Sequence, residues 1–243
     1  MPPARREAPK QPPLGRLSLA FGGAVLLAGA LIAVSFVGGG AADEGDAAPV
    51  ESSIPLGRDA LFIGIPQDGI SLGRPDAPVT LVEYADLQCP YCADWSRDAL
   101  PAVVEEYVRG GRVRLVFRGL AFLGPDSDKA LRAALAAGRQ DHLWDVVHAL
   151  FLHQGAENSG WVSDELLQSL GRTGFDADRM LAETASKSVE NELAAAQRAS
   201  EVAGVGGTPF FHAGKTGDGL APLQLGALDA ASIRAELDSL LAG

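Results

Sequence analysis

The sequence predicts an α/β fold with a block of helices inserted into it. Three observations predict this: a strand–helix–strand run over residues 79–118, a helical stretch over about 125–203, and a return to strands and a final helix after residue 207. A strand, a helix and a strand in that order imply a parallel pair of strands. The 243 residues are 47% hydrophobic and 21% charged, which is the composition of a globular protein.

The expected strands differ in their patterns. Residues 61–65 are mostly apolar and end at Pro66, which favours a first short strand. Residues 79–84 are β-branched and almost continuously apolar, which is typical of a central strand covered on both faces. Residues 113–118 alternate between apolar and polar. The helix between these two strands starts at Pro90, and Pro101 should kink it.

The inserted block and the end of the chain follow helix signals. Apolar residues recur at helical spacing after Asp126 and again over 143–151. Further helices are expected over 163–170, 176–181 and 186–203, because each begins at a Ser or Asp and Gly204 follows the last. Strands at 208–211 and 222–226 and a helix capped by Asp229 complete the predicted order.

The N-terminal residues carry a targeting signal. Residues 17–37 contain no charge and are long enough as a helix to span a bilayer core of about 30 Å. The basic residues of segment 1–16 precede them, so the N-terminus is expected in the cytoplasm. We therefore predict a cytoplasmic basic segment (1–16), a single transmembrane anchor (17–37), a flexible linker (38–60) and an extracytoplasmic domain (61–243). The alternative is a signal sequence cleaved near residues 40–42.

Charge and cysteine content exclude several classes of protein. The net charge of −11 argues against a nucleic-acid binder. The two cysteines, Cys89 and Cys92, are too few for a multi-disulfide scaffold or a four-cysteine zinc site. The histidines lack the paired spacing of metal ligands, so neither a metal nor another cofactor is predicted. We expect them to be ordinary surface or interface residues: His142, His148, His153 and His212.

The spacing of Cys89 and Cys92 indicates thiol–disulfide chemistry. With Cys89 as the N-cap and Pro90 at the first helical position, the sulfur of Cys89 faces unpaired N–H groups at the positive end of the helix dipole. These groups favour the thiolate, so Cys89 is the expected exposed nucleophile and Cys92 the buried resolving thiol. The alternative, a static disulfide, is a poor explanation because so short a loop gains little from being closed.

Two further elements belong to the predicted site. Glu83 interrupts an apolar strand six residues before Cys89, and a buried carboxyl there would accept the proton of Cys92. The alternative interpretation places Glu83 at a sheet edge, where it would reach solvent. Asp86, three residues before Cys89, is expected to be a turn residue. The proline of Thr208–Pro209 stands at a strand entrance, which suggests a cis peptide bond and an open Thr208 backbone that an extended substrate can pair with. The alternative interpretation of the Thr208–Pro209 segment is a plain turn.

Residues 61–243 resemble the DsbA-like branch of the thioredoxin superfamily. The resemblance lies in residues 76–92, in the helical insertion and in residues 207–211. It implies a thioredoxin-like fold with an inserted helical domain, attack by Cys89 and resolution by Cys92. It also implies that Glu83 is the buried acid and that four residues border the substrate groove: Pro90, Tyr91, Thr208 and Pro209. A membrane partner of the DsbB or VKOR type would reoxidise the pair.

The expected function is an extracytoplasmic thiol–disulfide oxidoreductase that introduces disulfides into exported proteins while they fold. Two alternatives remain: a membrane-tethered reductase or isomerase, and a non-catalytic chaperone of the same fold. The intervening Pro90–Tyr91 differs from the Pro-His pair of the strongest oxidants, so the direction of electron flow stays open.

Overall fold

The computed structural model describes residues 60–243. The predicted basic segment, the predicted membrane anchor and all but the last residue of the predicted linker lie outside these residues. Within the described part of the chain, no helix is long and apolar enough to cross a membrane.

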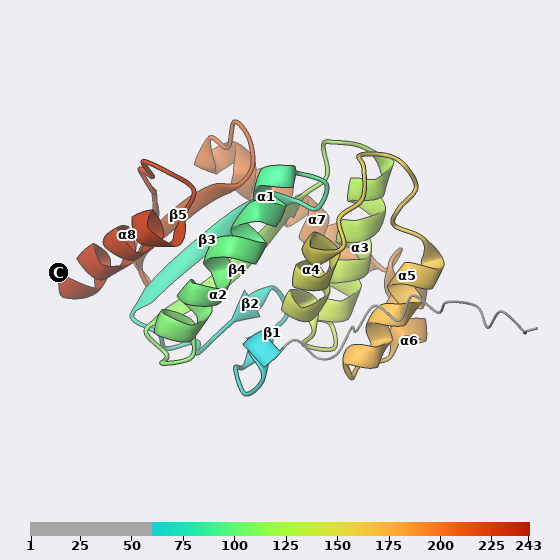
Figure 1. The fold of residues 1–243 in the computed structure, drawn as a ribbon, viewed down its shortest axis with the longest axis horizontal. Helices are drawn as coiled ribbons and strands as arrows, with labels where there is room; N and C mark the ends of the chain where they lie inside the picture. Colours follow the sequence, from blue (N-terminus) through green and yellow to red (C-terminus); the bar gives the residue numbers. More distant parts are fainter. Residues whose placement is uncertain (1–59) are drawn as a thin grey trace, which may run out of the picture. The chain divides into compact units, whose positions relative to one another are not determined.

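A six-stranded mixed sheet forms the centre of the domain (Figure 1), with strand order β1-β2-β4-β3-β5-β6. Strand β3 (Val79–Asp86) pairs in parallel with β4 (Val113–Leu120) and antiparallel with β5 (Phe210–Lys215). The predicted parallel pair is therefore confirmed. The remaining strands are short, two residues each: β1 (Gln67–Asp68), β2 (Ser71–Leu72) and β6 (Ala221–Pro222).

Two of the predicted strands are wrong. Residues 61–65 do not form a strand, because a 3₁₀ turn, η1 (Ala60–Phe62), begins the segment and Gly64 has a φ of +79°. Phe62 and Ile65 are buried by this turn, whereas a strand would expose one of them. At 222–226 the ladder stops at Pro222, although the Leu223 N–H still donates to the Phe211 carbonyl at 2.9 Å.

The helix between β3 and β4 runs without a break over residues 90–108 but changes its winding. Its parts are α1 (Pro90–Asp94), the π-helical η2 (Trp95–Ala99), α2 (Leu100–Val103) and the π-helical η3 (Val104–Val108). The first π turn directly precedes Pro101, which has no N–H to continue a regular ladder. The C-terminal helix α8 (Ala230–Ala242) packs against α2, β3 and β5.

The helical insertion joins the end of β4 to the start of β5 (Figure 1). The predicted caps are confirmed, since the side chains of Ser163, Asp176 and Ser186 each accept a backbone N–H of the first helical turn. The helices are α3 (Pro125–Gly138), α4 (Leu143–Leu152), α5 (Asp164–Ser169), the 3₁₀ turn η4 (Leu170–Thr173), α6 (Ala177–Glu183) and α7 (Lys187–Ala203).

Both faces of β3 are covered, as its sequence predicted. On one face Leu81 and Ala85 belong to the large core that the helix over residues 90–108 covers. On the other, Val82 and Tyr84 pack with Ala199 of α7. A residue in the middle of β3 is therefore shielded from water on every side.

Replacing Gly119 by alanine should destabilise the fold. A Cβ there would lie 2.1 Å from Leu131 Cδ1, a fully buried atom of α3 that has little room to move. Overpacking of this kind costs about 1–3 kcal/mol. Urea denaturation measures the loss, with Gly110→Ala as the matched control because a Cβ on Gly110 meets no atom within 4 Å. Equal losses for the two variants would contradict the packing described.

Candidate active site

The two cysteines lie at the N-terminal end of α1, directly after β3. Cys89 is the N-cap residue with extended backbone (φ −71°, ψ 120°), and Pro90 occupies the first turn, as predicted. Cys92 is fully buried. The prediction that Cys89 is exposed is wrong, because its side chain is only 6% exposed. The loop before β5 covers it and brings the Thr208 carbonyl oxygen to 3.2 Å from the sulfur.

Hydrogen-bond donors around its sulfur lower the pKa of Cys89 to about 6. The Cys92 thiol has the largest effect, followed by the Thr208 hydroxyl and then by the backbone N–H groups of Cys92 and Tyr91, while burial opposes all of them. Each donor stabilises the thiolate more than the thiol. At neutral pH Cys89 is therefore mainly ionised.

The pKa of Cys92 moves in the opposite direction. Burial raises it most, and the hydrogen bond to Cys89 and the negative charges of Cys89 and Glu83 raise it further. Cys92 therefore keeps its proton whenever Cys89 is a thiolate. The two sulfurs, three residues apart, are chemically unequal.

Glu83 is a buried acid in the middle of the sheet. It lies opposite Phe117 of β4 and Phe211 of β5, so the alternative of an edge position is excluded. Its side chain is 3% exposed, and burial raises its pKa to about 8 against the opposing effect of the Trp95 indole N–H. Oxygen Oε1 accepts no well-formed hydrogen bond from the described residues. Near neutral pH the carboxyl is therefore largely protonated.

The segment before β5 forms one wall of the site. The Thr208–Pro209 peptide bond is cis, as predicted. An apolar groove of about 380 Å³ begins there and extends along the sheet edge. Tyr91, which is 65% exposed, forms its opposite rim. The lining residues are Tyr91, Thr208, Pro209, Phe210, Phe211, Leu223, Leu225, Ala227 and Leu228.

Asp86 is a turn residue, as its sequence position suggested: it ends β3, and its carbonyl accepts the Cys89 N–H at 2.9 Å across the turn at 87–88. Its side chain is also fully buried, and its carboxylate accepts four hydrogen bonds. Oδ1 receives the Gln88 N–H at 2.9 Å and the Ser127 hydroxyl at 2.6 Å. Oδ2 receives the N–H groups of Phe122 and Leu123 at 2.9 and 3.1 Å. One carboxylate thus joins the turn before Cys89 to the beginning of the helical insertion.

Gln88 extends this connection. Its amide donates to Ser127 Oγ and to Asn158 Oδ1, each at 3.0 Å, and its Oε1 accepts the Asn158 N–H at 2.6 Å. The Gln154 amide donates to the carbonyls of Leu87 and Cys89 at 2.9 and 3.2 Å. Sequence reasoning missed these residues, since their partners lie 36–70 positions away and no local pattern marks them.

The histidines were expected to be ordinary surface or interface residues, and two of them are buried. His142 Nδ1 lies 2.9 Å from Asp145 Oδ2, and His148 Nδ1 lies 2.8 Å from Ser96 Oγ. The His142–Asp145 pair lies within the first turn of α4, whereas the His148–Ser96 pair joins α4 to η2. Among residues 60–243, no three or more His, Cys, Asp or Glu side chains form a group that suits a metal ion.

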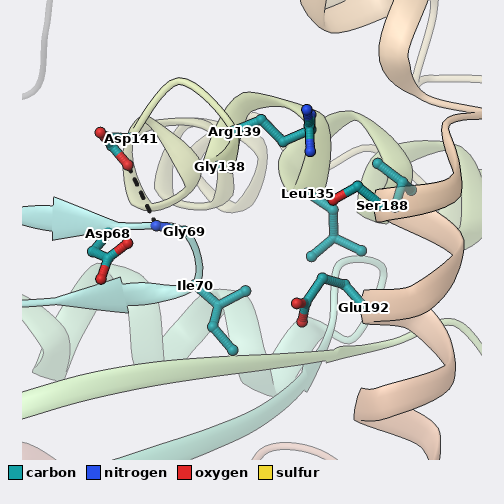
Figure 2. A pocket seen from close by; sticks show the side chains of 10 residues that line it. Asp68, Gly69, Ile70, Leu135, Gly138, Arg139, Asp141, Ser188 and Glu192 are labelled. Carbon is teal, nitrogen blue, oxygen red and sulfur yellow. Dashed lines mark hydrogen bonds between the residues drawn. The ribbon is translucent and has the colours of Figure 1, made fainter.

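A second hollow lies away from the cysteines, between the β1–β2 turn, the end of α3 and α7 (Figure 2). The Gly69 N–H approaches Asp141 Oδ1 at 3.4 Å, and Arg139 is paired with Glu183 at 2.6 Å. Its lining contains none of the predicted site residues.

Comparison with known proteins identifies the family of this chain. A family model described as thioredoxin matches residues 66–217. The probable disulfide bond formation protein D of Bacillus cereus is 30% identical over 147 residues, which cover 58% of this chain and 68% of that protein.

Solved structures show the same fold. The structure of oxidised BdbD from Bacillus subtilis matches with a TM-score of 0.62 and 23% sequence identity. The match covers 74% of this chain and 98% of the BdbD chain. The structure of a thioredoxin-like oxidoreductase from Silicibacter pomeroyi matches with a TM-score of 0.57 and 29% sequence identity. This match covers 76% of this chain and 98% of the Silicibacter chain.

Alkylation of the reduced protein should report the lowered pKa of Cys89. The rate should rise with pH and reach half its plateau at about pH 6, because only the thiolate reacts. An ordinary cysteine would give a midpoint of about 8.5. Stopped-flow measurement with iodoacetamide provides the profile, and Thr208→Val should shift the midpoint upward by removing one donor. A wild-type midpoint near the ordinary value would contradict the proposed stabilisation of the thiolate.

Replacing Glu83 by glutamine should stabilise the reduced protein increasingly between pH 5 and pH 8. The pKa of Glu83 rises from 4.5 to about 8 on folding, so in this window the folded state holds a proton that the unfolded chain has released, and wild-type stability falls as pH rises. Glutamine does not titrate, so the free energy of unfolding of Glu83→Gln should exceed that of the wild type by a few kcal/mol at the upper end of this window. The difference can grow by no more than about 1.4 kcal/mol per pH unit. Urea denaturation at several pH values measures the difference; a pH-independent difference would exclude a raised pKa.

Proposed function

We propose a reaction direction and residue roles for this chain, which belongs to the thioredoxin family and is a DsbA-like thiol–disulfide oxidoreductase. In this proposal it donates a Cys89–Cys92 disulfide to cysteines of exported proteins while they fold. The observation that carries the direction is the lowered pKa of Cys89, about 6. A stabilised thiolate favours the reduced form of the pair and makes its disulfide a stronger oxidant.

The exchange takes place in two steps. A client thiolate attacks the Cys89 sulfur, so that a client–Cys89 bond forms, the Cys89–Cys92 bond breaks and Cys92 leaves. A second client thiolate then attacks the client sulfur of this mixed disulfide and releases Cys89 as a thiolate. Two client thiols are oxidised to one disulfide, and the disulfide of this protein is reduced to two thiols.

Glu83 supplies the proton that Cys92 needs. The raised pKa of Cys92 makes its thiolate a poor leaving group, so protonation as it departs lowers the barrier. Glu83 is largely protonated near neutral pH because its pKa is raised to about 8. When the pair is reoxidised, the same carboxylate accepts the proton of Cys92.

The client backbone pairs with Thr208, and its side chains enter the groove beside Pro209. The N–H of Thr208 donates to no residue that the structure describes, so it is free for an extended chain. Tyr91 forms the opposite rim of the groove. Pro90 is exposed next to Cys89 but does not line the groove. An apolar groove of this kind takes many sequences, which suits an enzyme that acts on unfolded chains.

The reductase or isomerase alternative differs in redox potential. The pKa of Cys89, about 6, lies between the cysteine pKa values of thioredoxin, about 7, and of the strong oxidant DsbA, about 3.5. The potential is therefore expected between about −270 and −120 mV. The chaperone alternative predicts client binding that does not need the sulfur of Cys89.

The place of action in this proposal is outside the cytoplasm. Residues 17–37 anchor the chain, and the basic residues of 1–16 keep its N-terminus inside. A membrane partner of the DsbB or VKOR type reoxidises the cysteine pair. These proposals rest on the sequence, since residues 1–59 lie outside the described part of the chain.

Oxidation of a reduced, unfolded client tests the proposal. The oxidised wild type should form the client disulfide, Cys89→Ser should lose all activity, and Cys92→Ser should accumulate a mixed disulfide with a preoxidised client. Return of client enzymatic activity and mass spectrometry provide the readouts.

The controls separate the alternatives. Equal client recovery with wild type and Cys89→Ser would favour the chaperone. A potential at or below that of thioredoxin, about −270 mV, measured against glutathione or a lower-potential dithiol, would favour the reductase.

A further inference from the structure

We propose that a second pocket, on the side of the Thr208 loop opposite to the apolar groove, binds an uncharged side chain of the same client segment. This inference rests on the proposed function. The pocket, which we call the insertion-side pocket, has a volume of about 270 Å³. Its lining residues are Leu120, Ala121, Phe122, Gln197, Ser200, Val205, Gly206 and Gly207.

A single stretch of chain separates the two hollows. Gly206 and Gly207 line the insertion-side pocket, and the next two residues, Thr208 and Pro209, line the apolar groove. The carbonyl of Thr208 lies 3.2 Å from the sulfur of Cys89. A client bound at this sulfur therefore has one pocket on each side of it.

The backbone of this stretch is free to pair with a client. The N–H groups of Gly206, Gly207 and Thr208 donate to no residue in the range 60–243, and both glycines are exposed. An extended client adding a strand here advances about 3.3 Å per residue. Residues one or two positions from the client cysteine on one side reach the insertion-side pocket, and those on the other side reach the apolar groove.

The walls of the pocket select the side chain. None of its lining residues is charged, and Leu120, Phe122 and Val205 provide apolar surface. Phe122 is 57% exposed, which is unusual for a large apolar residue beside a reactive thiol. Its backbone N–H is held by the buried Asp86 carboxylate at 2.9 Å. The network that fixes the turn before Cys89 therefore also fixes this wall.

The glycines offer a way to close the pocket without disturbing the fold. A Cβ at Gly206 meets no atom within 4 Å, and its backbone is not left-handed. Gly206→Leu therefore adds a large side chain to the lining of the pocket without a clash. Gly110→Leu is a matched control, because Gly110 is equally exposed and unobstructed but follows the helix that ends at residue 108.

Exchange kinetics with short single-cysteine peptides test the inference on the oxidised full-length chain. The peptides carry leucine, aspartate or glycine one or two positions before or after the cysteine. Leucine on either side should speed mixed-disulfide formation by wild type by about fivefold over glycine, since part of an apolar side chain is buried. Gly206→Leu and Phe122→Ala should remove this gain on one side of the cysteine and keep it on the other, while Gly110→Leu behaves as wild type.

The possible outcomes are distinct. If wild type reacts with every peptide but Gly206→Leu keeps the gain on both sides, the insertion-side pocket is not a client site and the inference is overturned while the proposed function stands. If no peptide reacts with wild type, the proposed function itself fails. If the wild type sediments as a dimer and Gly206→Leu as a monomer, without a change in peptide preference, the pocket belongs to a contact with a second copy, and the inference is also overturned.

Discussion

The stabilisation of one sulfur anion is the interaction on which the site depends. Cys89 faces the Cys92 thiol, the Thr208 hydroxyl and two backbone N–H groups, and together they hold its pKa at about 6 although the side chain is 6% exposed. Burial alone would favour the thiol. The donors come from the start of α1 and from the loop before β5, so the reactivity of Cys89 requires both elements to be in place.

Asp86 explains how these elements are kept in place. Its buried carboxylate accepts hydrogen bonds from the turn that leads to Cys89 and from the chain that enters the helical insertion. Removing any of these donors would leave a buried charge short of partners, which is costly. The insertion is thus attached to the active-site turn through hydrogen bonds that the sheet itself does not make.

The acid–base chemistry follows from the position of β3 in the sheet. With β4 and β5 on either side and helices over both faces, Glu83 has no access to water, and this raises its pKa to about 8. The same burial raises the pKa of Cys92. The central strand β3 therefore leads into the turn before Cys89 and also carries Glu83, the group that exchanges protons with Cys92 in the proposed reaction.

The sequence by itself determined the parallel strand pair, the helix caps and the unequal cysteines, because short-range patterns decide these: apolar runs, a Ser or Asp before a helix, and a proline after Cys89. Tertiary structure alone decided the covering of Cys89 by Thr208, the four donors on Asp86 and the loss of the strand expected at 61–65. These features depend on contacts between residues far apart in the chain, whose geometry exists only after the sheet and the insertion have packed together.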